Sequence, residues 1–217
     1  MLNAPQTPAH TTTEAPAPAT SDWPAVASEL IQARQTVLPK RLLGPGPDAA
    51  QQHSILAAAA AAPDHGQLLP WRFVAVPEAQ REHLAEVFAQ ALLERDASAT
   101  PEQVAQAREK AHRAPWLLLL VVDGLRGDPA VDLSERILSA GCAVQNALLM
   151  ATALGFGSAL TSGKALKSAS LRTLFGLHSG EHALCFVSVG TVRSRKPARV
   201  RPAVADYLST LGDPPSP

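Results

Sequence analysis

The sequence predicts an α+β fold with a small sheet, and two observations carry this prediction. Three apolar stretches, residues 71–76, 117–122 and 183–190, have the length and composition of strands. The segments between them have apolar residues at helical spacing, but strands and helices do not alternate regularly as they do in a parallel α/β protein. We therefore expect one small sheet with helices packed around it.

Helices are predicted from apolar spacing and capping residues. Asp48 and Thr100 are suited to N-cap positions, and Pro101 and Gln103 complete a capped first turn after Thr100. Residues 134–154 carry too many apolar side chains for one stripe, so this helix should be buried on more than one side, in a central or subunit-interface position. The predicted helices span 25–33, 48–62, 78–95, 100–113, 134–154 and 170–175, with a short strand or turn at 158–161.

The chain is predicted to form one domain, from residue 23 to residue 211, because no linker-like break and no internal repeat interrupts it. Residues 1–22 are rich in Pro, Ala and Thr, a composition that buries too little apolar surface to offset the entropy of ordering. We expect this segment to be a disordered tail and residues 212–217 to be flexible.

Charge and cysteine content exclude several classes of protein. Lys and Arg (19) balance Asp and Glu (19), which argues against a nucleic-acid binder, and the longest apolar run, 115–122, is far too short to span a membrane. No Lys or Arg precedes Arg34, so a secretory or organellar signal is not expected and the predicted location is cytoplasmic. Cys142 and Cys185 form no metal-binding pattern, and no metal site is predicted.

Three familiar sequence signatures are incomplete. Residues 44–47 lack the third glycine of a dinucleotide-binding loop, and residues 162–165 lack parts of the P-loop pattern. Residues 155–158 lack the Gly-x-Ser-x-Gly order of a nucleophile elbow. We exclude Rossmann, kinase and hydrolase functions on this basis.

Two groups of residues far apart in the sequence are suited to a phosphate. Arg34, Gln35 and Thr36 end the first helix with a guanidinium, an amide and a hydroxyl, although an exposed polar helix end explains them about equally well. Arg199 and Arg201 lie in a segment held extended by flanking prolines, where residues two apart face the same way and two guanidiniums can clamp one phosphate.

The loop at residues 62–71 is suited to a flat heteroaromatic ligand. It places His65, Gln67 and Trp71 between two prolines and directly before a strand. Taken alone, the loop is explained slightly better as a structural turn capped by Asp64.

Together these segments resemble the FMN-dependent nitroreductase family, in particular the small minimal nitroreductases of bacteria. The matching segments occur in family order between about Leu30 and Arg201. They are Arg-Gln-Thr (34–36), Ala-Pro-Asp-His-Gly-Gln-Leu-x-Pro-Trp (62–71), Ser-Ala-Gly-Cys-Ala-Val-Gln-Asn (139–146), Gly-Phe-Gly-Ser-Ala-Leu-Thr-Ser-Gly (155–163) and Val-Gly-Thr (189–191).

The resemblance implies a small, mostly antiparallel central sheet flanked by helices, in a homodimer with the long helix near its axis and FMN at the subunit interface. It implies that Arg34 and Thr36, with Arg199 or Arg201, hold the 5′-phosphate, and that His65 from the partner contacts the flavin. The cofactor-binding residues expected from it are Arg34, Gln35, Thr36, His65, Leu160, Thr161, Ser162, Arg199 and Arg201.

The function that the resemblance implies is an NAD(P)H-dependent oxidoreductase that works by a ping-pong mechanism on a nitroaromatic, a quinone or a similar flat electrophile. The N5 atom of FMN carries the chemistry, so no catalytic side chain is assigned; Gln67 and Trp71 are expected to line the substrate slot. A flavin-binding or carrier protein without turnover is the alternative, favoured by Gln35 and Ala61 at positions where relatives often carry arginine. The choice between NADH and NADPH and the physiological acceptor stay open.

Overall fold

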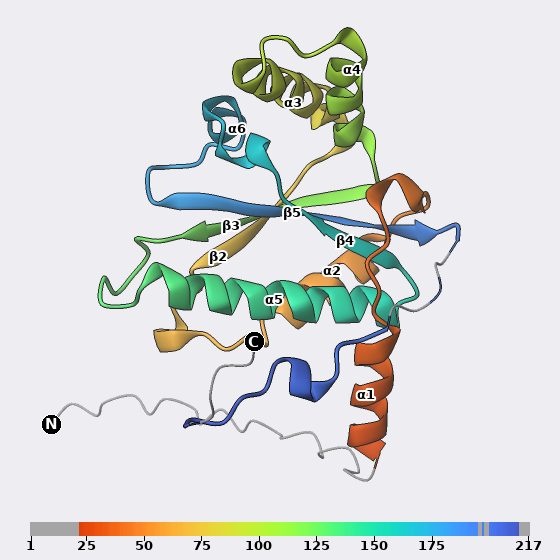
Figure 1. The fold of residues 1–217 in the computed structure, drawn as a ribbon, viewed down its shortest axis with the longest axis vertical. Helices are drawn as coiled ribbons and strands as arrows, with labels where there is room; N and C mark the ends of the chain where they lie inside the picture. The colour runs from red at the N-terminus through yellow and green to blue at the C-terminus, as the bar shows by residue number, and fades with distance from the viewer. Residues whose placement is uncertain (1–21, 195–196, 198–199, 213–217) are drawn as a thin grey trace, which may run out of the picture.

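The computed structural model describes residues 22–194, 197 and 200–212. A five-stranded antiparallel sheet lies between two layers of helices, which confirms the predicted α+β class (Figure 1). The tail predicted for residues 1–22 lies outside the described residues except for Asp22, and the flexible segment predicted for 212–217 does so except for Gly212. The strands are β1 (Leu42–Leu43), β2 (Trp71–Ala75), β3 (Trp116–Asp123), β4 (Gly157–Thr161) and β5 (Glu181–Val192).

The central strand of the sheet is β5. It pairs antiparallel with β3 along residues 181–189 and antiparallel with β4 along residues 186–190, so β3 and β4 occupy its two edges. Its last two residues pair with β1, and β2 adds to the free edge of β3. β5 thus pairs with three of the other four strands.

Alternate residues of β3 face two separate cores. Leu118, Leu120 and Val122 pack against α2 (Ala49–Ala59) and α5 (Leu133–Ala153) on one face of the sheet. Leu119 and Val121 pack against α3 (Arg81–Arg95) and α6 (Ala169–Leu174) on the other face. Because both faces are covered, the apolar run that the sequence shows here is continuous rather than alternating.

The helix starts follow the predicted capping chemistry. The Asp48 side chain accepts from the backbone N–H of Gln51 at 2.9 Å, and the Thr100 side chain accepts from that of Gln103 at 3.3 Å. In both cases the Gln Oε1 accepts in turn from the backbone N–H of the capping residue. The remaining helices are α1 (Trp23–Ala33) and α4 (Pro101–Glu109), which packs chiefly against α3 and η5. Short 3-10 segments are η2 (Pro39–Arg41), η3 (His65–Gln67), η4 (Glu78–Gln80), η5 (Lys110–His112), η6 (Lys164–Lys167) and η7 (Val204–Asp206).

Some predicted boundaries were wrong. The helix α2 ends at Ala59 rather than at 62, because the backbone before Pro63 tightens into bonds between residues three apart. The helix predicted to reach residue 113 ends at Glu109 and continues as η5. The strand β1 is not predicted from the sequence, because two residues are too few to show a periodicity.

The long helix α5 is buried on one side only within this chain, contrary to the prediction. Its inner stripe of mostly small residues, including Ala140, Ala143 and Ala147, packs on the sheet and on α2. By contrast, Ile137 is 40% exposed and Leu138 is 69% exposed. The second apolar side that the sequence contains is therefore open. In the described part of the chain, no helix is long and apolar enough to cross a membrane.

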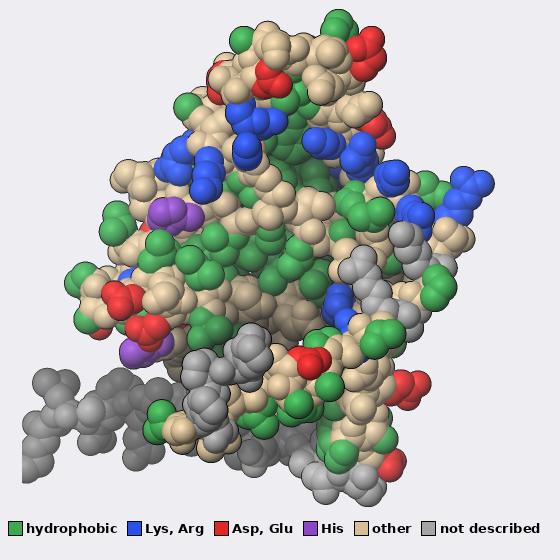
Figure 2. Space-filling view, in the orientation of Figure 1, with side chains coloured by type: hydrophobic (Ala, Val, Ile, Leu, Met, Phe, Trp, Pro, Cys, Tyr) green, Lys and Arg blue, Asp and Glu red, His purple; other side chains and the backbone are tan. Residues whose placement is uncertain are grey.

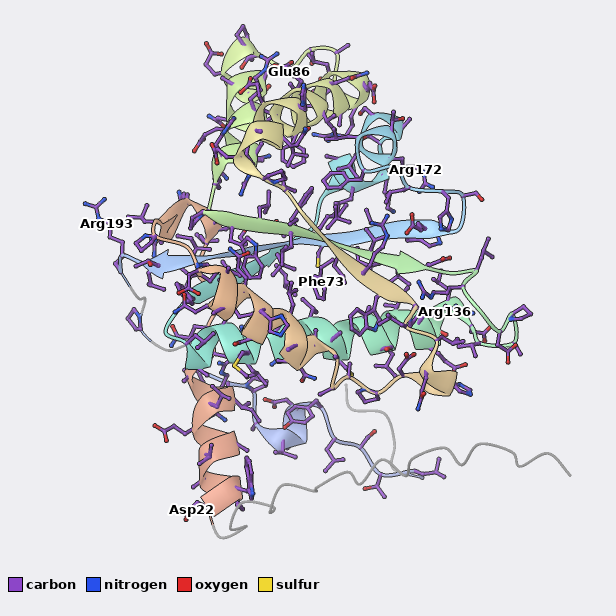
Figure 3. All side chains as sticks on the ribbon, turned by 180° about the vertical axis from the view of Figure 1, so that it is seen from behind. Asp22, Phe73, Glu86, Arg136, Arg172 and Arg193 are labelled. Atoms are coloured by element: carbon purple, nitrogen blue, oxygen red, sulfur yellow. The ribbon has the colours of Figure 1, made fainter. Side chains whose placement is uncertain are left out.

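A buried guanidinium organises the loop between β3 and α5. Arg136 is 1% exposed and donates to the backbone carbonyls of Val131 at 2.9 Å and Asp128 at 2.6 Å, and also to those of Arg126 and Asp123. The loop thus closes around one side chain at the start of α5 (Figure 3).

Replacing Arg136 with Met should destabilise the protein by about 3 kcal/mol, because buried carbonyls lose a charged donor. Urea unfolding followed by circular dichroism measures this loss. Arg126→Met is the matched control, since the Arg126 side chain is exposed, and it should change stability by less than about 0.5 kcal/mol. Equal midpoints for the two variants would show that Arg136 does not hold the loop.

Candidate functional site

The segment that follows α1 lies beside β4. Thr36 forms a parallel bridge with Ser158, and the backbone N–H of Val37 donates to the Ser158 carbonyl at 2.9 Å. Gly157 permits this close approach, because a Cβ there would lie 3.1 Å from the Val37 side chain and 2.4 Å from that of Val192 on β5. The first set of residues predicted to bind a phosphate, 34–36, is thus attached to the edge of the sheet at β4.

The two sets of residues predicted to bind a phosphate come together at this point. Arg201 Nη2 donates to the carbonyl oxygen of Arg34 at 3.0 Å, although the residues are 167 positions apart. Arg199 lies outside the described residues. Gln35 is half-buried and lines a small hollow with Thr152 and Phe156 at the end of α5; its role in cofactor binding stays a prediction.

Ser158 carries an unsatisfied group beside Thr36. Its hydroxyl is the one buried side-chain polar atom in the described part of the chain that has no hydrogen-bond partner, and the residue is 2% exposed. A buried hydroxyl without a partner costs free energy, so native structures usually supply a water or a ligand.

The other end of β4 opens into a cavity of about 610 Å³, which lies within the size range of ligand sites. Thr161 and Ser162 line it, whereas Leu160 does not; Leu160 is 40% exposed. Figure 2 shows the hollow below α3 and α4, with an apolar interior and Lys and Arg side chains around it. The apolar lining includes Leu38, Phe88, Leu92, Leu166 and Phe186, and the polar lining includes Gln103, Gln106, Arg95, Lys110, Arg113 and Lys164.

The strand β4 sets the distance between these two features. Ser158 and Thr161 are three residues apart, which corresponds to about 10 Å along an antiparallel strand. Residues three apart in a strand point to opposite faces, so the Ser158 side chain lies on the α5 face with Val189, whereas the Thr161 side chain lies on the cavity face with Phe186. The backbone of β4 connects the Arg34 segment to the cavity.

The third predicted group lies elsewhere. His65 is exposed in η3, and its Nδ1 lies 2.8 Å from Oε2 of Glu135 in the first turn of α5. Because α5 has 21 residues, its two ends are about 30 Å apart, and the Arg34 segment lies at the opposite end (Figure 1). Within one chain, His65 and Gln67 do not join the other predicted residues.

Trp71 has structural contacts in this chain. Its indole N–H donates to Ser139 Oγ at 3.0 Å, and its ring packs edge-on against Phe73 with centroids 5.9 Å apart. The residue is half-buried and joins the core on the α5 side of the sheet. Its assignment to the substrate slot stays a prediction, as does that of Gln67.

The loop that carries His65 has an unusual backbone. The φ angles of Gly66, Gln67 and Leu69 are 66°, 54° and 46°. They lie in the left-handed region, which residues other than glycine rarely adopt. Asp64 stabilises this conformation, because its Oδ2 accepts from the Leu69 N–H at 2.6 Å. The Asp64 side chain does not cap η3, contrary to the prediction, and holds the turn through Leu69 instead. The strained backbone is typical of functional loops.

The cationic side chains of the cavity are not predicted from the sequence. Lys164 belongs to a segment that resembles an incomplete P-loop, and Lys110 and Arg113 do not stand out from the other charged residues at the end of their helix. Their three-residue spacing is the only local signal, since residues three apart share one face of a helix. The cavity itself has no signal in the sequence, because six separate segments line it.

Comparison with known proteins gives a consistent result. The model of the family described as "Nitroreductase family" matches residues 31–191. A Haemophilus influenzae protein named "Putative NAD(P)H nitroreductase" is 34% identical over 155 residues, which cover 70% of this chain and 82% of that protein.

Two solved structures share the fold. A nitroreductase-like family protein from Bacillus cereus superimposes with a TM-score of 0.71 at 16% identity, covering 86% of this chain and 96% of that one. The NADPH:FMN oxidoreductase from Vibrio harveyi, solved in complex with NAD+, gives a TM-score of 0.69 at 18% identity, covering 88% and 79%. At these identities the likeness concerns the fold alone.

The pair formed by His65 and Glu135 yields a prediction about pH. The hydrogen bond to Glu135, and then its charge, raise the pKa of His65 above 6.5, so His65 stays protonated to a higher pH than an isolated histidine. Glu135→Gln should lower the pKa of His65 toward 6.5, although Asp128 and Asp64 still raise it slightly. An NMR titration of the imidazole measures this shift. Glu102→Gln on α4 is the control, and an unchanged pKa in Glu135→Gln would exclude the interaction in solution.

Proposed function

Because this chain belongs to the nitroreductase family, we propose that it is an NAD(P)H-dependent oxidoreductase that uses FMN and reduces nitroaromatics, quinones or similar flat electrophiles by a ping-pong mechanism. One observation supports the proposal: the Arg34 segment, which Arg201 contacts, lies at one end of β4, and a cavity of suitable size lies at the other. The names of the Haemophilus and Vibrio proteins support the donor, and that of the Vibrio protein supports the flavin.

The residues at the Arg34 end of β4 fit the phosphate and ribityl parts of FMN. The guanidinium of Arg201 donates to the Arg34 carbonyl there, and Thr36 follows along the edge of β4, so this region carries two arginines and a threonine. Charged donors bind phosphate more strongly than neutral ones. About 10 Å of strand then leads to the cavity, a distance comparable to a short polyol chain with its phosphate.

The residues of the cavity fit a flat ring. Apolar side chains, including Phe88 and Phe186, exclude water from its interior, while the exposed backbone of Thr161 and Ser162 borders it. Lys110 and Arg113 bring positive charge to the same space, which would stabilise the negative charge that arises on reduction. FMN, when bound, supplies the centre that accepts a hydride from NAD(P)H and passes it to the acceptor.

No side chain needs to donate or accept a proton in this scheme. The chain would hold the cofactor, orient the nicotinamide and then the acceptor in the same cavity, and keep water out. The lining of the cavity agrees with this scheme. In the described part of the chain it consists of apolar, uncharged polar and cationic residues and includes no carboxylate.

A homodimer would complete the site. α1 has no buried residue in one chain, and Trp23 and Ile31 are each 52% exposed on it. Together with the open side of α5 at Leu138, they form apolar surface that a monomer would expose to water. If two copies pack through their α5 helices in opposite directions, His65 of one copy approaches the Arg34 end of the other.

The purified protein tests the proposed function. It should retain visible flavin absorption after addition of FMN and desalting, and NAD(P)H should bleach these bands in the absence of oxygen. A nitroaromatic or quinone acceptor should restore them with continued turnover, and light scattering should give the mass of two chains. Retained flavin without turnover would favour the carrier function, and absence of flavin would refute both functions.

Arg34→Ala tests the assignment of the phosphate site. The variant should bind FMN about 1.5–3 kcal/mol more weakly, because a hydrogen bond to a charged group is lost. Titration of the apoprotein with FMN, followed by flavin fluorescence, measures the dissociation constant. Arg108→Ala is the matched control: Arg108 is exposed, pairs with Glu86 at 2.8 Å and does not line the cavity. Equal affinities for the two variants would remove Arg34 from the site.

A further inference from the structure

We propose that the cavity selects flat acceptors that carry a negative charge, such as carboxylated nitroaromatics or quinones, and that Lys164 sets this preference. The inference rests on the proposed function and names the class of substrate that this chain takes. It is carried by the distribution of charge around the cavity.

The charge of the cavity lining has one sign. Arg95, Lys110, Arg113 and Lys164 line it, and no Asp or Glu is among its lining residues in the described part of the chain. The protein as a whole has equal numbers of acidic and basic residues, so this asymmetry is local. Figure 2 shows the Lys and Arg side chains on either side of the apolar hollow.

One of the four cations is offset by a neighbouring carboxylate outside the cavity. Arg113 Nη2 lies 3.0 Å from Glu109 Oε2, one helical turn away.

The other three cations, Arg95, Lys110 and Lys164, have no such ion pair in the described residues. No carboxylate oxygen in the described residues lies within 4.0 Å of the ammonium groups of Lys110 or Lys164. They come from separate segments, η5 and η6, that meet at the cavity. The proposed function assigns Lys110 to the flavin. Of the other two, Lys164 directly follows residues 161–163, which border the proposed flavin ring, whereas Arg95 ends α3, so we assign Lys164 to the second ligand.

The position of Lys164 suits an acceptor. It follows Thr161, Ser162 and Gly163 directly, so it stands at the border where the ring of the cofactor is proposed to lie. No atom lies within 4 Å of the place where a Cβ on Gly163 would stand, so this border is open. An aromatic ring can pack on the apolar interior while its carboxylate meets the ammonium group.

Lys164 is exposed, so its effect on a bound anion is moderate and sensitive to salt. Exposed ion pairs contribute up to about 1 kcal/mol, which corresponds to about a fivefold change in affinity. A neutral acceptor of the same shape gains only the contact with the apolar interior.

A matched pair of acceptors tests the inference. 4-Nitrobenzoate and 4-nitrobenzamide have the same ring and nitro group but differ in charge, so the ratio of their kcat/KM values reports the contribution of the carboxylate. Because the two substituents also alter the reactivity of the nitro group, the decisive quantity is the change in this ratio between variants of the FMN-loaded protein.

Lys164→Gln should lower the ratio about fivefold at low ionic strength, and added salt should reduce the difference. Lys167→Gln is the matched control, because Lys167 is exposed at the end of the same 3-10 segment but does not line the cavity. An unchanged ratio in Lys164→Gln overturns the inference. So does a Lys164→Gln variant that changes only the KM for NAD(P)H, since Lys164 would then bind the donor.

A binding measurement separates this inference from the proposed function. Benzoate and benzamide are not reduced, and calorimetric titration of the FMN-loaded protein gives their affinities without turnover. Weaker binding of benzoate to Lys164→Gln, but not to Lys167→Gln, supports the anion preference even if neither nitro compound is reduced and the proposed function fails. Equal binding of benzoate and benzamide to all three proteins overturns it even if turnover is found.

Discussion

The pairing of β5 with β3 on one edge and β4 on the other determines where every part of the candidate site lies. Through β4, this pairing places Ser158 beside Thr36 and Thr161 at the cavity. Side chains of a strand alternate between its two faces, so a shift of β4 by one residue would exchange the groups that face each core. The tight contact at Gly157 opposes such a shift, since a larger residue there would collide with Val192.

Local chemistry made much of this fold predictable. The caps at Asp48 and Thr100 and the buried run of β3 depend on neighbouring residues, and the structure confirms them. The meeting of Arg34 with Arg201 depends on the whole sheet, so the sequence could supply two phosphate candidates but not their contact. The cationic cavity was missed for the same reason, because its lining comes from segments that are distant along the chain.

The predicted site residues fall into two sets at opposite ends of α5. Near its last turn lie the Arg34 segment and β4, and near its first turn lies the pair formed by His65 and Glu135. The apolar side of α5 between them is open, although the sequence predicts burial on more than one side. The prediction fails for one chain because the pattern of apolar residues does not distinguish surface buried within a chain from surface that a second copy would bury.

The outer wall of the cavity is only loosely connected to the rest of the protein. Helix α4 contributes Gln103 and Gln106 to the cavity, yet it packs chiefly against α3 and η5 rather than on the sheet. The Arg34 end of β4 has no part in that contact. Sequence changes in α4 can therefore alter this wall of the cavity, and with it the range of molecules that enter, without altering the contacts between the Arg34 segment and β4. This makes α4 a place where substrate preference can diverge during evolution.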